Sequence, residues 1–295
     1  MKKIKFNSDK IFYVITTIIA LFWVAIVLYP LIYIVSSSFS SGNAIISGKV
    51  ILWPVELSVS SYEYVFQYDR IWVAYANTIL YTIVGSLFTT LMTIMAAYPL
   101  SRKTFSGRRA IMTLFTVTMF FGGGLIPTYI QMSNMGLVNT RWIMFIAGIK
   151  NVSYIIIMKT FFKVSIPDDL LEAAKIDGIS DLNYLFKIVL PLSKPVISVI
   201  LLYSIVAHWN SYMTPLIYLM DRDLQPLQIV LKEILISSQI QPQDISSSEA
   251  VAEIQTFSES IKYSLVVVST VPMLILYPIV QKFFVKGMMM GSLKE

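Results

Sequence analysis

The chain has 295 residues, of which 56% are hydrophobic and 14% are charged. Soluble domains carry about 25% charged residues, so this composition excludes an ordinary soluble protein and indicates membrane-spanning segments. The net charge of +6 is therefore interpreted through membrane topology before nucleic-acid binding is considered. Cysteine is absent and His208 is the single histidine, which excludes disulfides, thiolate or histidine-cluster metal sites, and a Ser-His-Asp triad built elsewhere.

Six apolar stretches follow one another along the chain, and a helix needs about 20 residues to cross a bilayer. The first stretch follows a lysine-rich start and is too long for the core of a signal peptide, so it is interpreted as an uncleaved helix. We therefore predict an all-α membrane protein with a single transmembrane domain over residues 1–295. The six predicted spans are 11–35, 72–100, 110–130, 142–162, 191–220 and 263–284.

Several spans contain residues that interrupt helices. Pro30 is expected to kink or end the first helix, and the glycine run 122–124 with Pro127 is expected to break the third near the outer surface. The run lacks the lysine that a phosphate-binding loop requires. Polar residues interrupt the fourth span at 150–151, and a polar cluster that ends in Thr214-Pro215 interrupts the fifth over 208–215.

Two polar connections separate the spans at their outer ends. The first, 36–69, is expected to contain a short interfacial helix over 61–67. The second, 221–262, has no long apolar run and is predicted to be the longest outer segment.

The distribution of positive charge sets the orientation, because cytoplasmic loops of membrane proteins are enriched in Lys and Arg. If the amino terminus is cytoplasmic, most of the 23 Lys and Arg residues lie on the inner side. Six spans then return the carboxyl terminus to the cytoplasm as well. The connection between the fourth and fifth spans also falls on the cytoplasmic side.

This connection, residues 165–190, is the longest charged and helix-forming run between apolar stretches. Ser165 and Pro167 stand where a helix cap and a first-turn proline belong, and acidic residues follow where the helix dipole favours them. Gly178 is placed to end this helix in a left-handed conformation. Ser180 can cap a second helix, which would run towards Pro191.

The same segment contains a spaced motif, Glu172-Ala173-Ala174, Gly178 and Ile188-Val189-Leu190-Pro191. In residue type and spacing it resembles the EAA motif of ABC importer membrane subunits. Other fragments resemble the carbohydrate-type permeases of that family, which include the maltose permease G subunit. These fragments are 123–129, 136–140, 208–212, 226–228 and 284–287, and the resemblance covers nearly the whole chain.

The resemblance implies a permease subunit that moves a carbohydrate, expected to be an oligosaccharide, into the cytoplasm by alternating access. The chain has no Walker A loop, so ATP and Mg²⁺ would be held by a pair of partner ATPase subunits, and this chain would hold no cofactor or metal. The other implied partners are a second homologous permease subunit, an extracytoplasmic substrate-binding protein that part of 221–262 would meet, and the bilayer of the cytoplasmic membrane, with no nucleic acid. The coupling helix between spans four and five would use Glu172, Ala173, Ala174, Asp177 and Gly178, and the two alanines would let the ATPase approach closely.

A substrate path is suggested by polar and aromatic residues in or near the fourth and fifth spans. They are Asn151, Tyr154, Trp209, Asn210 and Tyr212. Polar groups within the membrane usually face a bundle interior or an aqueous cavity, and aromatic faces with amide donors suit sugar rings. Helix–helix hydrogen bonding or anchoring at the membrane interface would explain the same residues.

Other functions remain open at this level. A permease of the same family for a polyol or another organic solute is one alternative. An intramembrane enzyme would need an HExxH, paired-aspartate or GxSxG motif, none of which is present. A secondary transporter would be expected to show matched inverted repeats and a mid-span carboxylate, which this chain lacks.

Overall fold

The computed structural model describes the backbone of residues 5–239 and 248–291, and the side chains of residues 10–239 and 254–278. Every regular element within these ranges is a helix, which confirms the all-α prediction. The elements are α1 (Lys5–Ser38), α2 (Gly42–Ile46), α3 (Ser60–Gln67), α4 (Arg70–Ser101), α5 (Arg108–Phe120), α6 (Leu125–Asn134), α7 (Trp142–Ile146), α8 (Val152–Ser165), α9 (Asp168–Ile176), α10 (Asp181–Tyr184), η1 (Leu185–Val189), α11 (Leu190–Leu192), α12 (Lys194–Trp209), α13 (Met213–Tyr218), η2 (Arg222–Leu224), α14 (Leu227–Ser238) and α15 (Ser248–Gly291).

Among the described residues, three helical stretches are long and apolar enough to cross a membrane, namely Lys10–Ser38, Arg70–Ser101 and Ile254–Pro278. The number rises to five if two bent pairs each count as one span. One pair is α5 and α6, which meet at 118°, and the other joins the run 181–192 to α12 at 80°. The predicted first, second and sixth spans therefore each lie within a single helix.

The interruptions of the other spans lie close to where the sequence indicated them. The third span breaks at 121–124, the fourth at 147–151 between α7 and α8, and the fifth after Trp209. Pro30 does not end the first helix, because α1 continues through it to Ser38. The fourth stretch is not among the five candidate spans, so the count of six and the position of both termini stay predictions.

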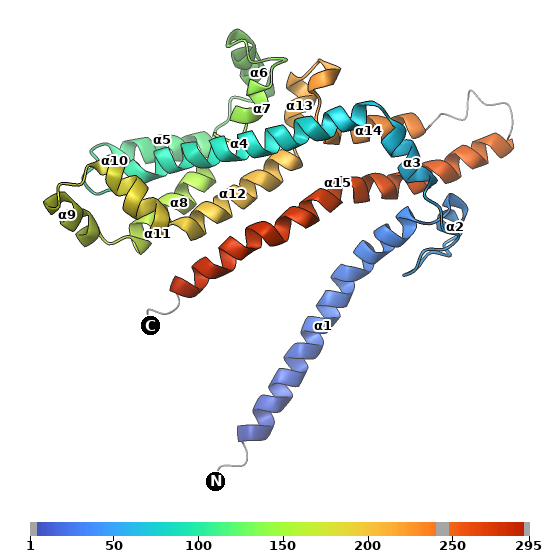
Figure 1. The fold of residues 1–295 in the computed structure, drawn as a ribbon, viewed down its shortest axis with the longest axis horizontal. Coiled ribbons are helices and arrows are strands. Elements are labelled where there is room, and N and C mark those ends of the chain that lie inside the picture. Colours follow the sequence, from blue (N-terminus) through green and yellow to red (C-terminus); the bar gives the residue numbers. More distant parts are fainter. Residues whose placement is uncertain (1–4, 240–247, 292–295) are drawn as a thin grey trace. The chain divides into compact units, whose positions relative to one another are not determined.

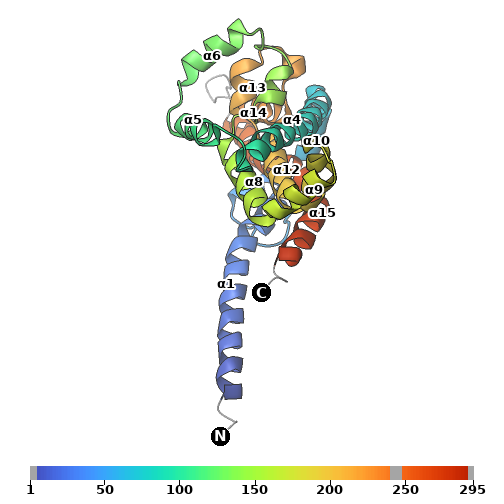
Figure 2. The ribbon, with the colours of Figure 1, turned by 90° about the vertical axis from the view of Figure 1, so that its left-hand side faces the viewer.

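The chain forms two compact units. The first comprises Met1–Asp69 and Leu231–Val271, and the second comprises Arg70–Val230 and Pro272–Glu295. In the second unit, α4 packs along both α8 and α12, and α5 lies beside α4 and α8 (Figures 1 and 2). Small residues on the buried face of α4, among them Gly85, Ser86 and Thr89, let these helices approach closely.

The segment 221–262, predicted as a polar connection without a long apolar run, contains helices that the sequence did not indicate. It contains α14 and the beginning of α15, so the last long helix starts at Ser248 and not near Tyr263. The short apolar run that forms α14 is buried at Leu227 and Ile234. Residues 240–247, within the connection that is expected in part to meet a binding protein, lie outside the described residues.

Side chains of α4 hold the loop that precedes α14. The amide of Asn77 donates to the carbonyl of Asp223 at 2.7 Å, and the hydroxyl of Tyr81 donates to that of Leu224 at 2.8 Å. The hydroxyl of Thr78 accepts a hydrogen bond from the backbone N–H of Leu227 at 2.7 Å, in a fully buried position. These contacts satisfy backbone groups that would otherwise be buried without partners.

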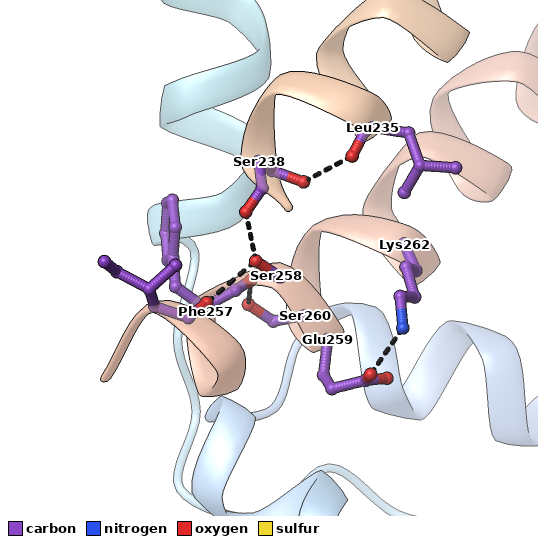
Figure 3. Close-up of polar contacts among 8 residues, drawn as sticks. Leu235, Ser238, Phe257, Ser258, Glu259, Ser260 and Lys262 are labelled. Carbon is purple, nitrogen blue, oxygen red and sulfur yellow. Dashed lines mark hydrogen bonds and ion pairs between the residues drawn. The ribbon is translucent and has the colours of Figure 1, made fainter. Parts of the chain in front are cut away.

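The first unit is held by contacts between short helices and α15. The hydroxyl of Ser258 donates to the carbonyl of Ser238 at the end of α14, and Lys262 pairs with Glu259 one turn along α15 (Figure 3). A β-carbon on Gly42 would overlap the backbone of Thr256, so α2 begins directly against α15. Glycine at position 42 is therefore required by this close approach.

We predict that Thr78→Val lowers the thermal unfolding midpoint of the detergent-solubilised chain. Valine keeps the shape of threonine but leaves the buried N–H of Leu227 without an acceptor, at a cost of about 1–3 kcal/mol. Thr82→Val is the matched control, because its buried hydroxyl lies one turn along α4 and has no hydrogen-bond partner among the described residues. Equal midpoints for the two variants would contradict this role of Thr78.

Candidate functional site

The stretch between α8 and α12 forms two helical pieces joined at a glycine. After α9, Gly178 has φ +68°, and the N–H of Ile179 donates to the carbonyl of Ala174 at 2.9 Å. This is the left-handed helix ending expected from the sequence. The hydroxyl of Ser180 then accepts from the N–H of Asn183 at 3.4 Å, so Ser180 caps α10 as predicted.

The beginning of α9 differs from the prediction. Ser165 is the last residue of α8, and Pro167 directly precedes α9 without a side-chain cap hydrogen bond. The acidic first turn is present as expected, with Asp168 and Asp169 at its start. Negative charge near the helix dipole therefore stabilises this end in place of a serine cap.

The two alanines of the motif face different surroundings. Ala174 is 4% exposed and packs in a core with Phe162 and Tyr184, whereas Ala173 is exposed. Successive helical residues point about 100° apart, and here that difference places Ala174 in the core and Ala173 at the surface. The expectation that both alanines admit a partner is corrected: Ala173 is available and Ala174 fixes α9 to its own chain.

The exposed side chains of the stretch between α8 and α12 are partly acidic and partly apolar. Glu172 and Asp177 are exposed, and Ile176, Leu182 and Phe186 are exposed by 87%, 70% and 61%. Large apolar side chains grouped with charged ones on a surface are typical of a protein–protein contact. We refer to these five exposed residues of α9, its end, α10 and η1 together as the coupling surface.

Two basic residues after α4 attach the stretch between α8 and α12 to that helix. Arg102 is 6% exposed, and its guanidinium carbon lies 4.9 Å from the ring centroid of Tyr98 and 5.5 Å from that of Tyr184 on α10. Lys103 forms an ion pair with Asp168 at the start of α9, with 2.7 Å between nitrogen and oxygen. In the sequence alone, both residues stand out only as positive charge.

The pair also affects protonation. The hydrogen bond from Lys103 lowers the pKa of Asp168 below its usual range, and the same contact raises the pKa of Lys103. Asp168 therefore stays ionised until the pH falls through its lowered pKa, so the attachment persists at neutral pH. The Lys103 side chain is largely exposed and the Asp168 side chain partly so, which makes the pair a positioning contact and only a weak source of stability.

The predicted substrate-path residues occupy two places. Asn151 and Tyr154 lie at the start of α8, where the ring of Tyr154 stacks on Tyr203 of α12 at 6.3 Å. Asn210 and Tyr212 follow the end of α12, with Asn210 exposed and Tyr212 half-buried. Trp209 is 2% exposed and belongs to the interior of this conformation.

His208, at the end of α12, packs against the residues just before α8 and so joins these two places. It is buried, and its Nδ1 lies 2.9 Å from the carbonyl of Ser204 in the preceding turn. A β-carbon added to Gly148 would lie 2.9 Å from His208 Cε1 and would overlap the hydroxyl of Thr89, and one added to Gly85 would overlap the histidine ring. The ring therefore fills a slot between α4 and the break that separates α7 from α8. The sequence indicated the breaks but not that these two glycines and His208 join them.

Comparison with known proteins now bears on this arrangement. Residues 71–290 match the family described as "Binding-protein-dependent transport system inner membrane component". The chain belongs to this family. Members are transport subunits of the membrane, which confirms the resemblance inferred from the motif.

The three similar proteins that follow are each named for the transport of a carbohydrate. The polygalacturonan/rhamnogalacturonan transport system permease protein YtcP of Bacillus subtilis is 38% identical over 274 residues, which cover 93% of this chain and 95% of that protein. The diacetylchitobiose uptake system permease protein NgcG of Streptomyces coelicolor is 25% identical over 292 residues, covering 98% and 91%. A solved structure of a bacterial ABC transporter involved in the import of the acidic polysaccharide alginate contains a chain that is 34% identical, with a TM-score of 0.81 and coverage of 94% and 98%.

We predict that Gly148→Ala and Gly85→Ala each destabilise this family member by about 1–3 kcal/mol, because the added methyl group overpacks the histidine slot. The thermal unfolding midpoint in detergent is the measurement. Gly123→Ala is the control, because a β-carbon added there would lie 3.9 Å from its nearest neighbour, Pro127 Cβ. His208→Ala should offset most of the loss caused by Gly85→Ala, since it removes the atoms that clash. Strictly additive losses in this double variant would show that the slot does not couple the two positions.

Proposed function

We propose that the chain is a permease subunit of an ABC importer that carries a carbohydrate into the cytoplasm. It forms one transmembrane domain over 1–295 in the cytoplasmic membrane, with six spans, the interrupted α7–α8 stretch as the fourth, and both termini cytoplasmic. Support comes from the family, from the transport systems named for its relatives, and from the excess of Lys and Arg on one side. Its partners are a second homologous permease subunit, a pair of ATPase subunits and an extracytoplasmic binding protein.

The observation that carries the proposal is an exposed coupling surface attached firmly to a long helix. Arg102 and Lys103 connect the end of α4 to α10 and α9, while Glu172 and Ile176 remain exposed. A partner docked on α9 would therefore displace α4 as well as α8 and α12. Rigid-body movement of packed helices is an established route from a local event to a change of access.

In this mechanism the ATPase pair binds and hydrolyses ATP with Mg²⁺, and this chain converts the resulting movement into alternating access. Glu172, Ala173 and Asp177 are proposed to contact the ATPase directly. Ala174 and Gly178 are proposed to hold the shape that presents them, through packing and through the left-handed corner.

The proposed cargo is an oligosaccharide, with fragments of acidic polysaccharides as the first candidates. The support is that two of the similar transporters are named for polygalacturonan/rhamnogalacturonan and for alginate. Asn151, Tyr154, Asn210 and Tyr212 are proposed to border the path beside the His208 slot, where breaks expose amide and aromatic groups. Buried Trp209 would reach the path only in another conformation.

Topology can be tested directly because the natural chain has no cysteine. Single cysteines in place of Ser106 and Ser180, both accessible at the surface, should react with an impermeant maleimide only from the cytoplasmic side. A cysteine in place of Asp223, exposed between α13 and α14, should react only from outside. Labelling at position 180 from outside would overturn both the orientation and the coupling proposal.

The function is tested by reconstituting the chain with the second permease, the ATPase pair and the binding protein in proteoliposomes. We expect ATP-dependent uptake of an oligosaccharide, which Gly178→Val reduces severalfold while membrane insertion is unchanged. A β-branched residue at this positive φ is strained by roughly 1 kcal/mol or more, whereas Gly178→Asn should retain uptake because asparagine tolerates the conformation.

Uptake, ATP turnover and ATPase association are measured together on these variants. Wild-type uptake by Gly178→Val would show that the corner is only a connection between spans. Absence of binding-protein-dependent uptake of any oligosaccharide, acidic or neutral, by the wild-type assembly would refute the proposed cargo class.

A further inference from the structure

A groove with a volume of about 680 Å³ lies in the second unit between the end of α4, α5 and α8. Five cationic side chains line it together with apolar and hydroxyl side chains. The cations are Lys103, Arg108, Arg109, Lys159 and Lys163. No carboxylate is among the lining residues of this groove.

The lining is polarised along the groove. Lys103, Arg108 and Arg109 lie in the turn before α5 and in its first residues, and Lys159 and Lys163 lie in the last two turns of α8. The far end of α5 contributes Val117, Phe120 and Phe121 to the same groove. The 13 residues of α5 extend for about 20 Å, so charge gathers at one end and aromatic surface at the other.

Most of this positive charge is not neutralised by the protein. Lys103 is paired with Asp168, whereas the other four cations have no ion pair among the described residues. No residue of α5 is buried within the chain, and Phe120 and Phe121 are about three-quarters exposed. Figure 2 shows α5 set to one side of α4, α8 and α12 in this unit. The groove therefore offers an anion site continuous with an uncovered apolar wall.

We propose that this groove binds an anionic phospholipid. Its phosphate lies among Arg109, Lys159 and Lys163, and an acyl chain runs along Val117 and Phe120. The proposal rests on the proposed function in one respect, the orientation that puts the charged end at the cytoplasmic surface, where anionic headgroups attract basic residues.

The polarity gradient distinguishes this ligand from the alternatives. An oligosaccharide carries polar groups along its whole length, and the far end of the groove, at Val117, Phe120 and Phe121, has no amide, hydroxyl or charged side chain to bind them. A free phosphate would use only the charged end. A phospholipid has its charge at one end and its apolar surface at the other, as the groove does.

The test is native mass spectrometry of the full-length detergent-solubilised chain with equal amounts of phosphatidylglycerol and phosphatidylcholine of matched acyl chains. The wild type should retain phosphatidylglycerol preferentially. The double variant Lys159→Gln/Lys163→Gln should bind it about tenfold or more weakly, since each cation near a headgroup contributes roughly a fivefold change in affinity. Arg109→Gln, at an exposed position, should lower binding on its own by roughly fivefold.

The matched control is Lys187→Gln/Lys194→Gln, which removes the same charge from positions outside the groove and should bind like the wild type. Equal loss in the control would overturn the site in favour of general surface charge. No preference for phosphatidylglycerol in the wild type would overturn it as well.

Competition separates the lipid from soluble ligands. sn-Glycerol 3-phosphate and digalacturonate, each at the lipid concentration, should not displace phosphatidylglycerol. Displacement by the first would assign the groove to a soluble anion, and displacement by the second would assign it to the cargo. The assay contains no transport step, so its failure would leave the proposed importer function standing, and a failure of uptake would leave the lipid site standing.

Discussion

Backbone groups buried in irregular structure must find hydrogen-bond partners within the protein, and the second unit depends on this constraint. A backbone N–H or C=O that is buried without a partner costs several kcal/mol. The structure meets the constraint with side chains of one long helix. Asn77, Thr78 and Tyr81 on α4 bind the loop before α14. Polar residues in an apolar helix are thereby explained as supports for irregular backbone.

The same helix also packs against the two interrupted stretches, α7–α8 and the end of α12. Gly85 and Thr89 on α4 approach Gly148 and His208, so the break before α8 and the end of α12 pack at one point. Because this slot has no spare volume, its parts are expected to move together as a unit. Breaks that would weaken isolated helices are thus the places where these helices pack against one another.

At its other end, α4 is connected to the stretch between α8 and α12 by one buried contact and one exposed contact. The guanidinium of Arg102 between Tyr98 and Tyr184 is buried, where cation–π attraction is strongest. The ion pair of Lys103 and Asp168 is exposed and orients α9 with little energy of its own. A buried inner contact with an exposed outer one would suit the proposed role of this stretch, which is to dock to a partner and transmit its movement.

The sequence by itself determined the helical class, the positions of the breaks, the corner at Gly178 and the cap at Ser180. Each is a local property, set by apolar length, by proline and polar interruptions, by a residue without a β-carbon, or by a hydroxyl next to free N–H groups. The family motif is likewise a pattern of spacing within one segment.

Only the tertiary structure decided which residues meet. The inward position of Ala174, the buried place of Arg102, the histidine slot and the basic groove beside α5 each combine residues from helices far apart in the sequence. Helix α14 escaped prediction because its apolar run is short and lies among polar residues, and its burial depends on partners such as Thr78. Periodicity and composition describe a segment and its own surface, whereas packing depends on the surfaces that surround it.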